Sequence, residues 1–469
     1  MTGPGTASNL GELRTSGWRS EPVKAEMRRN LLSRMRDGRP AVDGLVGYDE
    51  TVLPALENAV IAGHDVMLLG ERGQAKSRII RSLVGLLDEW TPAVAGSEIC
   101  DDPYAPVSRY ARDLVAEKGD ETPISWVNRR ERYGEKLATP DTSIADIIGE
   151  IDPIKVAEGR YLSDELTVHY GLVPRSNRGI FAINELPDLA ERIQVGLLDV
   201  LEERDVQIRG HKVRLEVDLM LVASANPEDY TNRGRIITPL KDRFGARVRT
   251  HYPGDVATEL AIVHQEASPI EEVGARVEVP EFMAEIVARL SQLARRSPRV
   301  SQRSGVSVRL SITNFETLSA AAVSRAVRHG EAEAVPRPSD LDSLLCSTLG
   351  KVEVESLEEG EEEEVVAKLV MAAVLETFRA RVPTGELGRV VGGFEDGGVV
   401  HAGPDLSSSQ YAGILEQVPA LRGPACALAG SESAGMLASA IELILEGLHL
   451  SKRLNKEVAG ARATYRGRS

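Results

Sequence analysis

Apolar residues gather in three short uninterrupted runs, at 66–69, 180–183 and 219–222, each flanked by Gly, Asn or Asp. An uninterrupted apolar run, in contrast to an alternating one, is typical of a strand that is buried on both faces of a parallel sheet. Helical spacing of apolar positions follows at 77–87 and 190–203. The pattern therefore predicts an α/β core with a doubly wound parallel sheet.

Helical patterns continue on both sides of this core. A first helix is expected at 21–36, and the four acids among the eight basic residues of 1–40 favour packing on the core over binding to a membrane or nucleic acid. Further patterns predict helices at 279–294, 312–329, 363–381 and 434–455, and a Gly-rich loop at 392–403.

These patterns divide the chain into four expected parts. They are an N-terminal tail and helix at 1–40, the α/β core at 41–268 with a polar insertion at about 90–164, a helical lid at 269–350, and a mainly helical C-terminal segment at 351–469.

Composition changes the picture by excluding classes of function. The chain has 469 residues, and 56 basic against 71 acidic residues give a net charge of −15, which disfavours a general nucleic-acid binder. Eight glutamates and one lysine lie between Lys351 and Glu364. No window of 18 uninterrupted apolar residues occurs, so no membrane is expected. Three widely spaced cysteines indicate a reducing compartment, and we expect a cytoplasmic protein without a resident transition metal.

The first apolar run leads into a glycine-containing loop that opens a helix. This is the context of a phosphate loop, whose backbone N–H groups and helix N-terminus hold phosphate oxygens. Lys76 is expected to reach the β- and γ-phosphates, and the Ser77 hydroxyl is expected to hold Mg²⁺. The alternative is a chance strand–turn–helix with a buried lysine stem. The expected nucleotide contacts are Gly70, Glu71, Arg72, Gly73, Gln74, Ala75, Lys76 and Ser77.

Ala75 departs from the phosphate-loop consensus, which has glycine before the lysine. Alanine disfavours positive φ. A single methyl group can fit if the backbone is helical at this position.

The second apolar run ends in Asn184 and Glu185. In phosphate-loop ATPases an acid at the first position orders Mg²⁺ through water, and the following Glu polarises the attacking water. Asn184 can hydrogen-bond a metal-bound water but supplies no negative charge. We therefore predict weakened Mg²⁺ retention, slowed hydrolysis or both, with Glu185 as the general base. The alternative is that both residues simply end a strand.

Three further polar residues extend the candidate site. Asn226 follows the third apolar run and is expected to orient the attacking water. Arg243 is a candidate arginine finger for the nucleotide of a neighbouring subunit, which requires a ring or a dimer; the alternative is a surface ion pair with Asp242. Arg309 begins a helix of the lid and is the candidate for reaching the γ-phosphate, with Arg303 as its rival and no role at the nucleotide as the alternative.

The order of these motifs resembles that of an AAA+ ATPase. Several details are similar to the magnesium-chelatase small (I) subunit and its MoxR-type relatives. Val46 and Gly47, within 45–50, resemble the adenine-side Val-Gly box, and 176–181 resembles the chelatase lead-in to the second strand. The segment 224–228 resembles the Asn-Pro-Glu sensor, and 206–215 the β-hairpin of this clade. The resemblance covers about 43–318.

The resemblance implies a P-loop AAA+ core with an α-helical lid, and ATP with Mg²⁺ as cofactors. It also implies assembly into a homo-oligomeric ring, usually a hexamer, and a partner with a von Willebrand A-type domain. The implied activity is ATP-driven remodelling of a partner, which means metal insertion into porphyrin in chelatases and metalloprotein maturation or complex assembly in MoxR relatives.

Two alternatives to such a motor follow from the residues. Ala75 and Asn184 would also suit a nucleotide-gated assembly scaffold that barely hydrolyses ATP. A DNA-remodelling relative is the third class: the activator signature GAFTGA is absent and the net charge opposes it, although the expected hairpin carries Arg209, His211, Lys212 and Arg214.

Overall fold

The computed structural model divides the chain into two compact units, Met1–His251 and Tyr252–Ser469. It describes residues 5–151, 165–202, 205–207, 214–226, 235–268, 270, 275–301, 305–354, 360–395 and 397–468. The division precedes the expected end of the core at 268, because helix α12 (Val256–Glu266) packs on helices of the second unit.

The first unit contains the following helices and strands, in chain order. They are α1 (Leu10–Thr15), α2 (Val23–Arg36), α3 (Val52–Ala62), β1 (Val66–Leu69), α4 (Lys76–Ser82), η1 (Leu83–Leu86), β2 (Trp90–Val94), α5 (Arg109–Lys118), η2 (Gly119–Glu121), β3 (Ile124–Asn128), β4 (Tyr133–Leu137), α6 (Ile144–Ile147), β5 (Gly149–Ile151), η3 (Glu165–Thr167), β6 (Val168–Tyr170), α8 (Leu172–Arg175), β7 (Gly179–Asn184), η4 (Leu186–Asp188), α9 (Glu191–Glu202), β8 (Asp205–Gln207), β9 (Arg214–Glu216), β10 (Leu219–Ala225), α11 (Thr238–Arg243) and β11 (Ala246–Arg249).

A five-stranded sheet in the order β11-β1-β10-β7-β4 forms the centre of the first unit, and every pair in it is parallel. The register pairs Leu69 of β1 with Ala225 of β10, and Ile183 of β7 with Ala223 of β10. The carboxyl ends of β1, β10 and β7 therefore meet at one edge. In open α/β sheets, this edge is where ligands bind.

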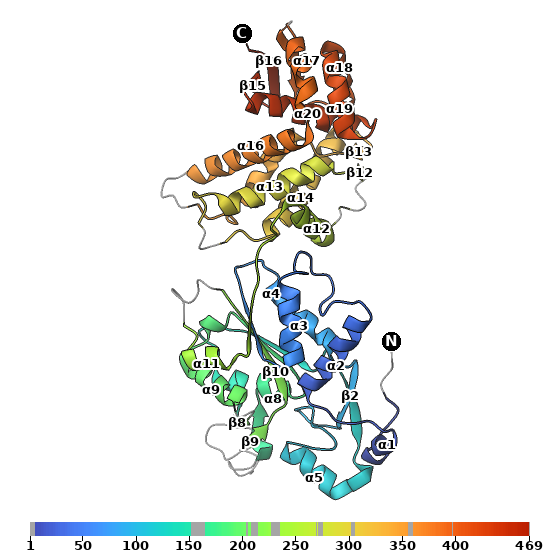
Figure 1. Cartoon of the computed structure of the whole chain (residues 1–469), viewed down its shortest axis with the longest axis vertical. Helices are drawn as coiled ribbons and strands as arrows, with labels where there is room; N and C mark the ends of the chain where they lie inside the picture. The colour runs from blue at the N-terminus through green and yellow to red at the C-terminus, as the bar shows by residue number, and fades with distance from the viewer. Residues whose placement is uncertain are drawn as a thin grey trace. The chain divides into compact units, whose positions relative to one another are not determined.

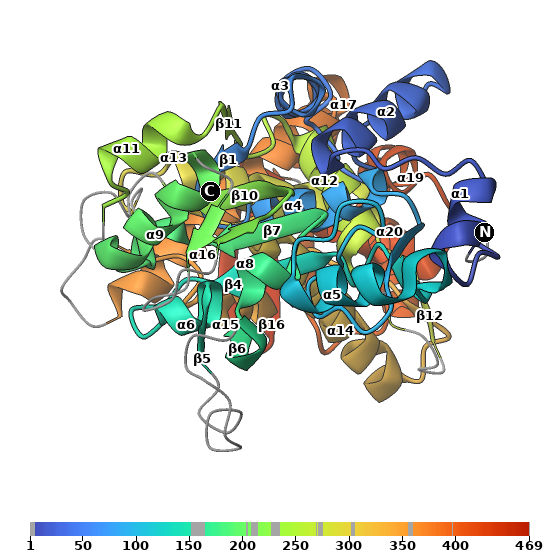
Figure 2. The same ribbon diagram turned by 90° about the horizontal axis from the view of Figure 1, so that it is seen from below.

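Successive residues of the three buried strands face opposite sides of the sheet. Met67, Phe181 and Leu221 pack in the apolar cluster that includes α9 and α11. Their neighbours Leu68, Ala182 and Val222 pack in the cluster that includes α2, α3 and α4. Figures 1 and 2 show these two groups of helices on opposite sides of the strands. The doubly wound α/β prediction is confirmed.

Helix α2 packs on the core, as the sequence predicted. Met27 and Leu31 are fully buried against α3 and the sheet. Glu26 receives two hydrogen bonds from the guanidinium of Arg132, at 2.8 and 2.6 Å, and Arg132 is 1% exposed. A buried pair of this kind requires both partners, because either one alone would be an uncompensated charge.

The expected insertion at about 90–164 contributes to the central sheet, so describing it only as an insertion was wrong. Strand β4 forms the edge of the five-stranded sheet beside β7. Before it, β2 and β3 form an antiparallel pair. Residues 152–164 of this segment lie outside the described residues.

The second unit is mainly helical. Its elements are α12, β12 (Arg276–Val277), α13 (Glu281–Arg296), α14 (Arg309–His329), β13 (Glu333–Ala334), η5 (Pro338–Ser343), α15 (Leu344–Thr348), α16 (Glu361–Arg381), α17 (Thr384–Glu395), β14 (Val399–Ala402), η6 (Ser408–Gln410), α18 (Tyr411–Gln417), η7 (Pro419–Leu421), α19 (Arg422–Ala429), α20 (Ala434–Leu450), β15 (Leu454–Ala459) and β16 (Arg462–Gly467).

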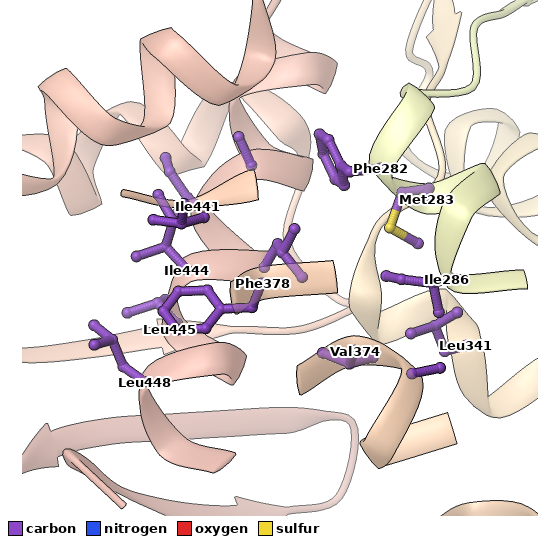
Figure 3. Packing of buried hydrophobic residues seen from close by; sticks show 14 of the residues in the cluster. Phe282, Met283, Ile286, Leu341, Val374, Phe378, Ile441, Ile444, Leu445 and Leu448 are labelled. Carbon is purple, nitrogen blue, oxygen red and sulfur yellow. The ribbon is translucent and has the colours of Figure 1, made fainter. Parts of the chain in front are cut away.

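One apolar core joins the expected lid and the expected C-terminal segment. It extends from Phe282 on α13 through Phe378 on α16 to Leu448 on α20 and Tyr465 on β16. Figure 3 shows Phe378 beside Ile444, Leu445 and Leu448 of α20, with Phe282 and Met283 of α13 in the same cluster. The boundary expected at 350 therefore falls inside one packed core.

Two boundaries predicted in the C-terminal segment were wrong. The expected loop at 392–403 contains the end of α17 and strand β14, and the last expected helix ends at Leu450, before β15. Strands β14, β16 and β15 form an antiparallel sheet with β16 in the middle.

Within the described ranges, no single helix combines the length and apolar character needed to cross a membrane. The bent pair 419–429 and 434–450, with an angle of 112°, meets these limits only when its two helices are taken together.

Candidate functional site

The loop after β1 has a fixed, closed shape. The Gly70 N–H donates to the Ala225 carbonyl at 3.1 Å, and a Cβ at Gly70 would overlap the side chains of Thr250 and Gln74. The Gln74 Oε1 accepts hydrogen bonds from the Glu71 N–H at 3.0 Å and from the Thr250 hydroxyl at 2.8 Å. The loop is thereby fastened to the tips of β10 and β11.

Ala75 has φ 55° and ψ 15°, which is left-handed backbone and not the helical conformation in which the methyl group would fit without strain. It is the N-cap of α4, and Gly73 in the same loop has φ 75°. The loop therefore keeps the turn of a glycine-containing phosphate loop, at a cost of about 1 kcal/mol for the alanine methyl.

Lys76 is the first residue of α4 and is 7% exposed. Its Nζ donates to the carbonyls of Gly70 at 2.5 Å and Glu71 at 2.8 Å, and to the Asn226 Oδ1 at 2.7 Å. The ammonium group thus lies inside the loop and faces the tip of β10, which is the position from which a lysine contacts phosphate oxygens. Arg72 is exposed, and so is Ser77, which is the second residue of α4.

Asn226 connects Lys76 with Glu185. While its Oδ1 accepts from Lys76, its Nδ2 donates to the Glu185 Oε2 at 3.0 Å. Glu185 follows β7 in left-handed backbone, with φ 55°, and its N–H donates to the Ser224 hydroxyl at 3.3 Å. Three residues predicted from separate motifs therefore form one hydrogen-bonded chain across the tips of β1, β10 and β7.

Asn184 forms a second chain beside the first. Its Oδ1 accepts from the Ser224 hydroxyl at 3.1 Å, and its Nδ2 donates to the Glu135 Oε1 at 2.6 Å. Asn184 is 8% exposed. Glu135 lies on β4 and also accepts from the Arg81 Nε at 2.9 Å.

Glu135 is a site residue that sequence reasoning missed, because it lies in the segment taken for an insertion. Burial opposes its ionisation, but the side chains of Arg81, Tyr133 and Asn184 outweigh burial and lower the pKa of the carboxyl below its usual value. The carboxylate is therefore charged at neutral pH.

Tyr48 joins the expected adenine-side box to the phosphate loop. Its hydroxyl lies 2.9 Å from the carbonyls of Gln74 and His251. Burial raises the pKa of Tyr48 to about 12, so the hydroxyl keeps its proton and can donate. Val46 and Gly47 immediately precede it, and Gly47 has φ 79°. The contribution of Tyr48 is visible only in three dimensions.

Two further predicted arginines lie on α11 and α14. Arg243 ends α11 with its side chain 39% exposed, and its Nη1 is 3.7 Å from Asp242. This contact agrees with the surface ion pair considered as its alternative, and the finger role stays a prediction. Arg309 begins α14 in the second unit and is exposed.

Several sequence predictions fall outside the described residues. They concern Pro227, Glu228, Arg303 and the hairpin residues Arg209, His211 and Lys212. The strands on either side of that hairpin, β8 and β9, do pair antiparallel as expected.

The sequence matches a family model described as a sigma-54 interaction domain over residues 157–243. It is also 32% identical over 230 residues to magnesium-chelatase subunit ChlI of Nostoc sp., which spans 47% of this chain and 57% of that subunit. The 38 kDa magnesium-chelatase subunit of Rhodobacter capsulatus is 29% identical, with 47% of this chain and 59% of that subunit covered.

The chain resembles the AAA+ subunit I of magnesium chelatase. The similarity is partial on both sides, since the chain spans a little over half the length of these relatives. Chloroplastic ChlI-1 of Arabidopsis thaliana shows the same relation, with 31% identity, 48% of this chain and 50% of that protein. The resemblance expected from the motifs is confirmed.

Two solved structures match the chain at lower sequence identity. A complex of the magnesium-chelatase subunits BchI and BchD matches with 23% identity and a TM-score of 0.35, covering 69% of this chain and 97% of that one. NtrX from Brucella abortus matches with 17% identity and a TM-score of 0.39, covering 74% and 66%.

Proposed function

We propose that the chain binds ATP with Mg²⁺ at this AAA+ core and hydrolyses it to ADP and phosphate. The observation that carries the proposal is the chain Lys76–Asn226–Glu185, which joins a phosphate-loop lysine to a carboxylate through the residue expected to orient the attacking water. An isolated lysine in a strand–turn–helix would not require the other two residues.

The residues present fit a nucleotide and its metal. The loop N–H groups and Lys76 would hold the β- and γ-phosphates, and the Ser77 hydroxyl would be a ligand of Mg²⁺. The Asn184 side chain, at the tip of β7, would hydrogen-bond a water of the metal's shell. Bound Mg²⁺ neutralises charge on the phosphate oxygens.

Glu185 would act as the general base. Its carboxylate takes the proton of the attacking water as the water oxygen bonds to the γ-phosphorus and the bond to the bridging oxygen breaks. The Asn226 Nδ2 donates to this carboxylate at 3.0 Å, and Glu185 itself has left-handed backbone, with φ 55°. The position is thereby fixed before the nucleotide binds.

Single-turnover hydrolysis tests the proposal. The unaltered chain should bind ATP and form ADP, and Glu185→Gln should keep ATP binding while hydrolysis falls by about 10²- to 10⁴-fold. Glu191→Gln, an exposed glutamate at the start of α9, is the matched control and should behave as the unaltered chain.

The same experiment separates the motor from a nucleotide-gated scaffold. Ala75 and Asn184 are the observations that favour a scaffold, because each departs from the residue that phosphate-loop ATPases have there. Tight ATP binding without any ADP from assembled protein would establish the scaffold and contradict the hydrolysis proposal.

The role proposed for ATP hydrolysis is remodelling of a partner, or metal insertion or metalloprotein maturation, in the cytoplasm. It rests on the resemblance to chelatase subunit I, and so does the proposed homo-oligomeric ring with Arg243 acting on a neighbouring nucleotide. A von Willebrand A-domain protein is the proposed partner. Sedimentation of the Glu185→Gln variant with ATP tests the ring, and a chain that stays monomeric would contradict it.

A further inference from the structure

The second hydrogen-bonded chain places a carboxylate where the sequence shows none. Position 184 carries a neutral amide, yet the Glu135 Oε1 lies 2.6 Å from its Nδ2. Strand β4 is paired with β7 in parallel, with Leu137 opposite Asn184, so Glu135 reaches the tip of β7 from the adjacent strand. The Glu135 side chain is 21% exposed, against 66% for Arg81, whose guanidinium donates to both carboxylate oxygens, at 2.9 and 3.1 Å.

We propose that Glu135 supplies the negative charge of the metal side of the nucleotide site, acting through Asn184 as a positioning residue. The inference rests on the proposed function. The carboxylate expected at the end of β7 is in this view replaced by a pair, in which β7 provides the amide and β4 provides the charge. The pair as a whole has the charge of one aspartate.

The orientation of the Asn184 amide follows from the same contact. A carboxylate accepts hydrogen bonds only, so Glu135 fixes the Nδ2 on its side and the Oδ1 on the side of Ser224. The Ser224 hydroxyl can then donate to that oxygen and accept from the Glu185 N–H. Glu135 is thereby linked to the backbone of the proposed base by an unbroken chain of hydrogen bonds.

Arg81 does not remove this charge from the site. Its ion pair with Glu135 involves a mostly exposed guanidinium, and exposed ion pairs are screened by water and salt. The Glu135 Oε1 accepts both from the Arg81 Nη2, at 3.1 Å, and from the Asn184 Nδ2, at 2.6 Å, and the Asn184 partner is only 8% exposed, so screening is weaker on that contact. A metal-bound water hydrogen-bonded to Asn184 would therefore experience the charge of Glu135.

A charge count gives the proposal its sharpest consequence. Asn184→Asp alone would place two carboxylates within hydrogen-bonding distance, and like charges at that separation oppose each other. The exchanged pair, Glu135→Gln with Asn184→Asp, restores one carboxylate and one amide, with the donor and acceptor reversed. The single and double variants therefore differ in net charge at a site of the same shape.

The experiment measures the affinity for a fluorescent ATP analogue in Mg²⁺ and in EDTA, and takes the ratio as the gain due to the metal. Glu135→Gln should reduce this gain by about 10- to 100-fold, the usual effect of removing an outer-shell partner of a metal ligand. A folding defect would lower both affinities alike. Glu131→Gln, an exposed glutamate just before β4, is the matched control and should keep the gain.

The exchanged pair should recover the gain that Glu135→Gln loses, and Asn184→Asp alone should unfold at a lower temperature than the exchanged pair. An undiminished gain in Glu135→Gln, or an Asn184→Asp variant equal to the exchanged pair in both measurements, would overturn the inference and leave the proposed function standing. Absence of any nucleotide binding by the unaltered chain would overturn both.

Discussion

Two non-glycine residues with left-handed backbone, Ala75 and Glu185, lie at the candidate site. Strained backbone of this kind persists where the surrounding contacts fix it, and it is frequent at functional sites. The sequence could identify both residues, since a motif is recognised from the types and spacing of its residues. It could not predict their backbone conformation, because φ is determined by contacts between segments that are distant in the chain. Examples are the hydrogen bond of Thr250 to Gln74, beside Ala75, and that of the Glu185 N–H to Ser224.

At this scale the conformation of Ala75 leads to a prediction. Ala75→Gly should raise the stability of the first unit by up to about 1 kcal/mol, because relief of the left-handed alanine exceeds the entropy that glycine adds to the unfolded chain. Denaturant unfolding of the full chain measures the change. Ala320→Gly, in the exposed middle of α14, is the control and should destabilise by about 1 kcal/mol. A loss of stability in Ala75→Gly would contradict the strain.

At the scale of elements, burial decides what the sequence predicts. The strands β1, β7 and β10 are buried on both faces, so their apolar runs identified them, and with them the residues at their tips. Strand β4 lies at the sheet edge and reads Tyr-Gly-Glu-Lys-Leu, which carries no such signal. Glu135 was missed for this reason, and the Asn184 site was incomplete without it.

Helix ends in the second unit were missed for a related reason. Gly392 and Gly393 lie within α17, where packing of Val390 and Phe394 holds the helix despite two poor helix formers. Local propensity indicated a loop, and burial of the apolar face outweighed it.

The contact between α16 and α20 gives a prediction for these elements. A Cβ at Gly447 would overlap the ring of Phe378, so the two helices approach closely there. Gly447→Ala should destabilise the second unit by about 1–3 kcal/mol, the usual cost of overpacking. Calorimetry of the full chain measures it.

Gly413→Ala is the matched control in α18, where a Cβ meets nothing within 4 Å. The methyl group should there stabilise the helix by up to about 1 kcal/mol. Equal effects of the two substitutions would contradict close packing at Gly447.

At the scale of the whole molecule, each unit has a core of its own. The apolar clusters around the sheet belong to the first unit, and the large cluster from Phe282 to Tyr465 belongs to the second. The division after His251 was not predicted, since α12 follows the α/β part directly in sequence. Only the packing of α12 on α13 and α14 assigns it to the second unit.

Separate cores predict separate responses to nucleotide. A non-hydrolysed ATP analogue with Mg²⁺, at about 100 times its Kd, should stabilise the unit that carries Lys76 and Glu185 by about 2.7 kcal/mol. Calorimetry distinguishes the units, because Gly447→Ala marks the transition of the second one. A nucleotide that shifts only the marked transition would contradict the site. If nucleotide also shifts the transition of the second unit, and this shift is lost in Arg309→Ala, the result would support the predicted contact of Arg309 with the nucleotide.

Strand β16 has a consequence for how the chain is made. It lies between β14 and β15, so the three-stranded sheet of the second unit has no central strand until residues 462–467 have been synthesised. The first unit has all of its sheet strands once β11 is complete. At a synthesis rate of about 5–20 residues per second, the first unit would be complete and able to fold well before the second unit has all the residues of its core. During that interval the apolar faces of α13, α16 and α20 are the surfaces that a chaperone would bind.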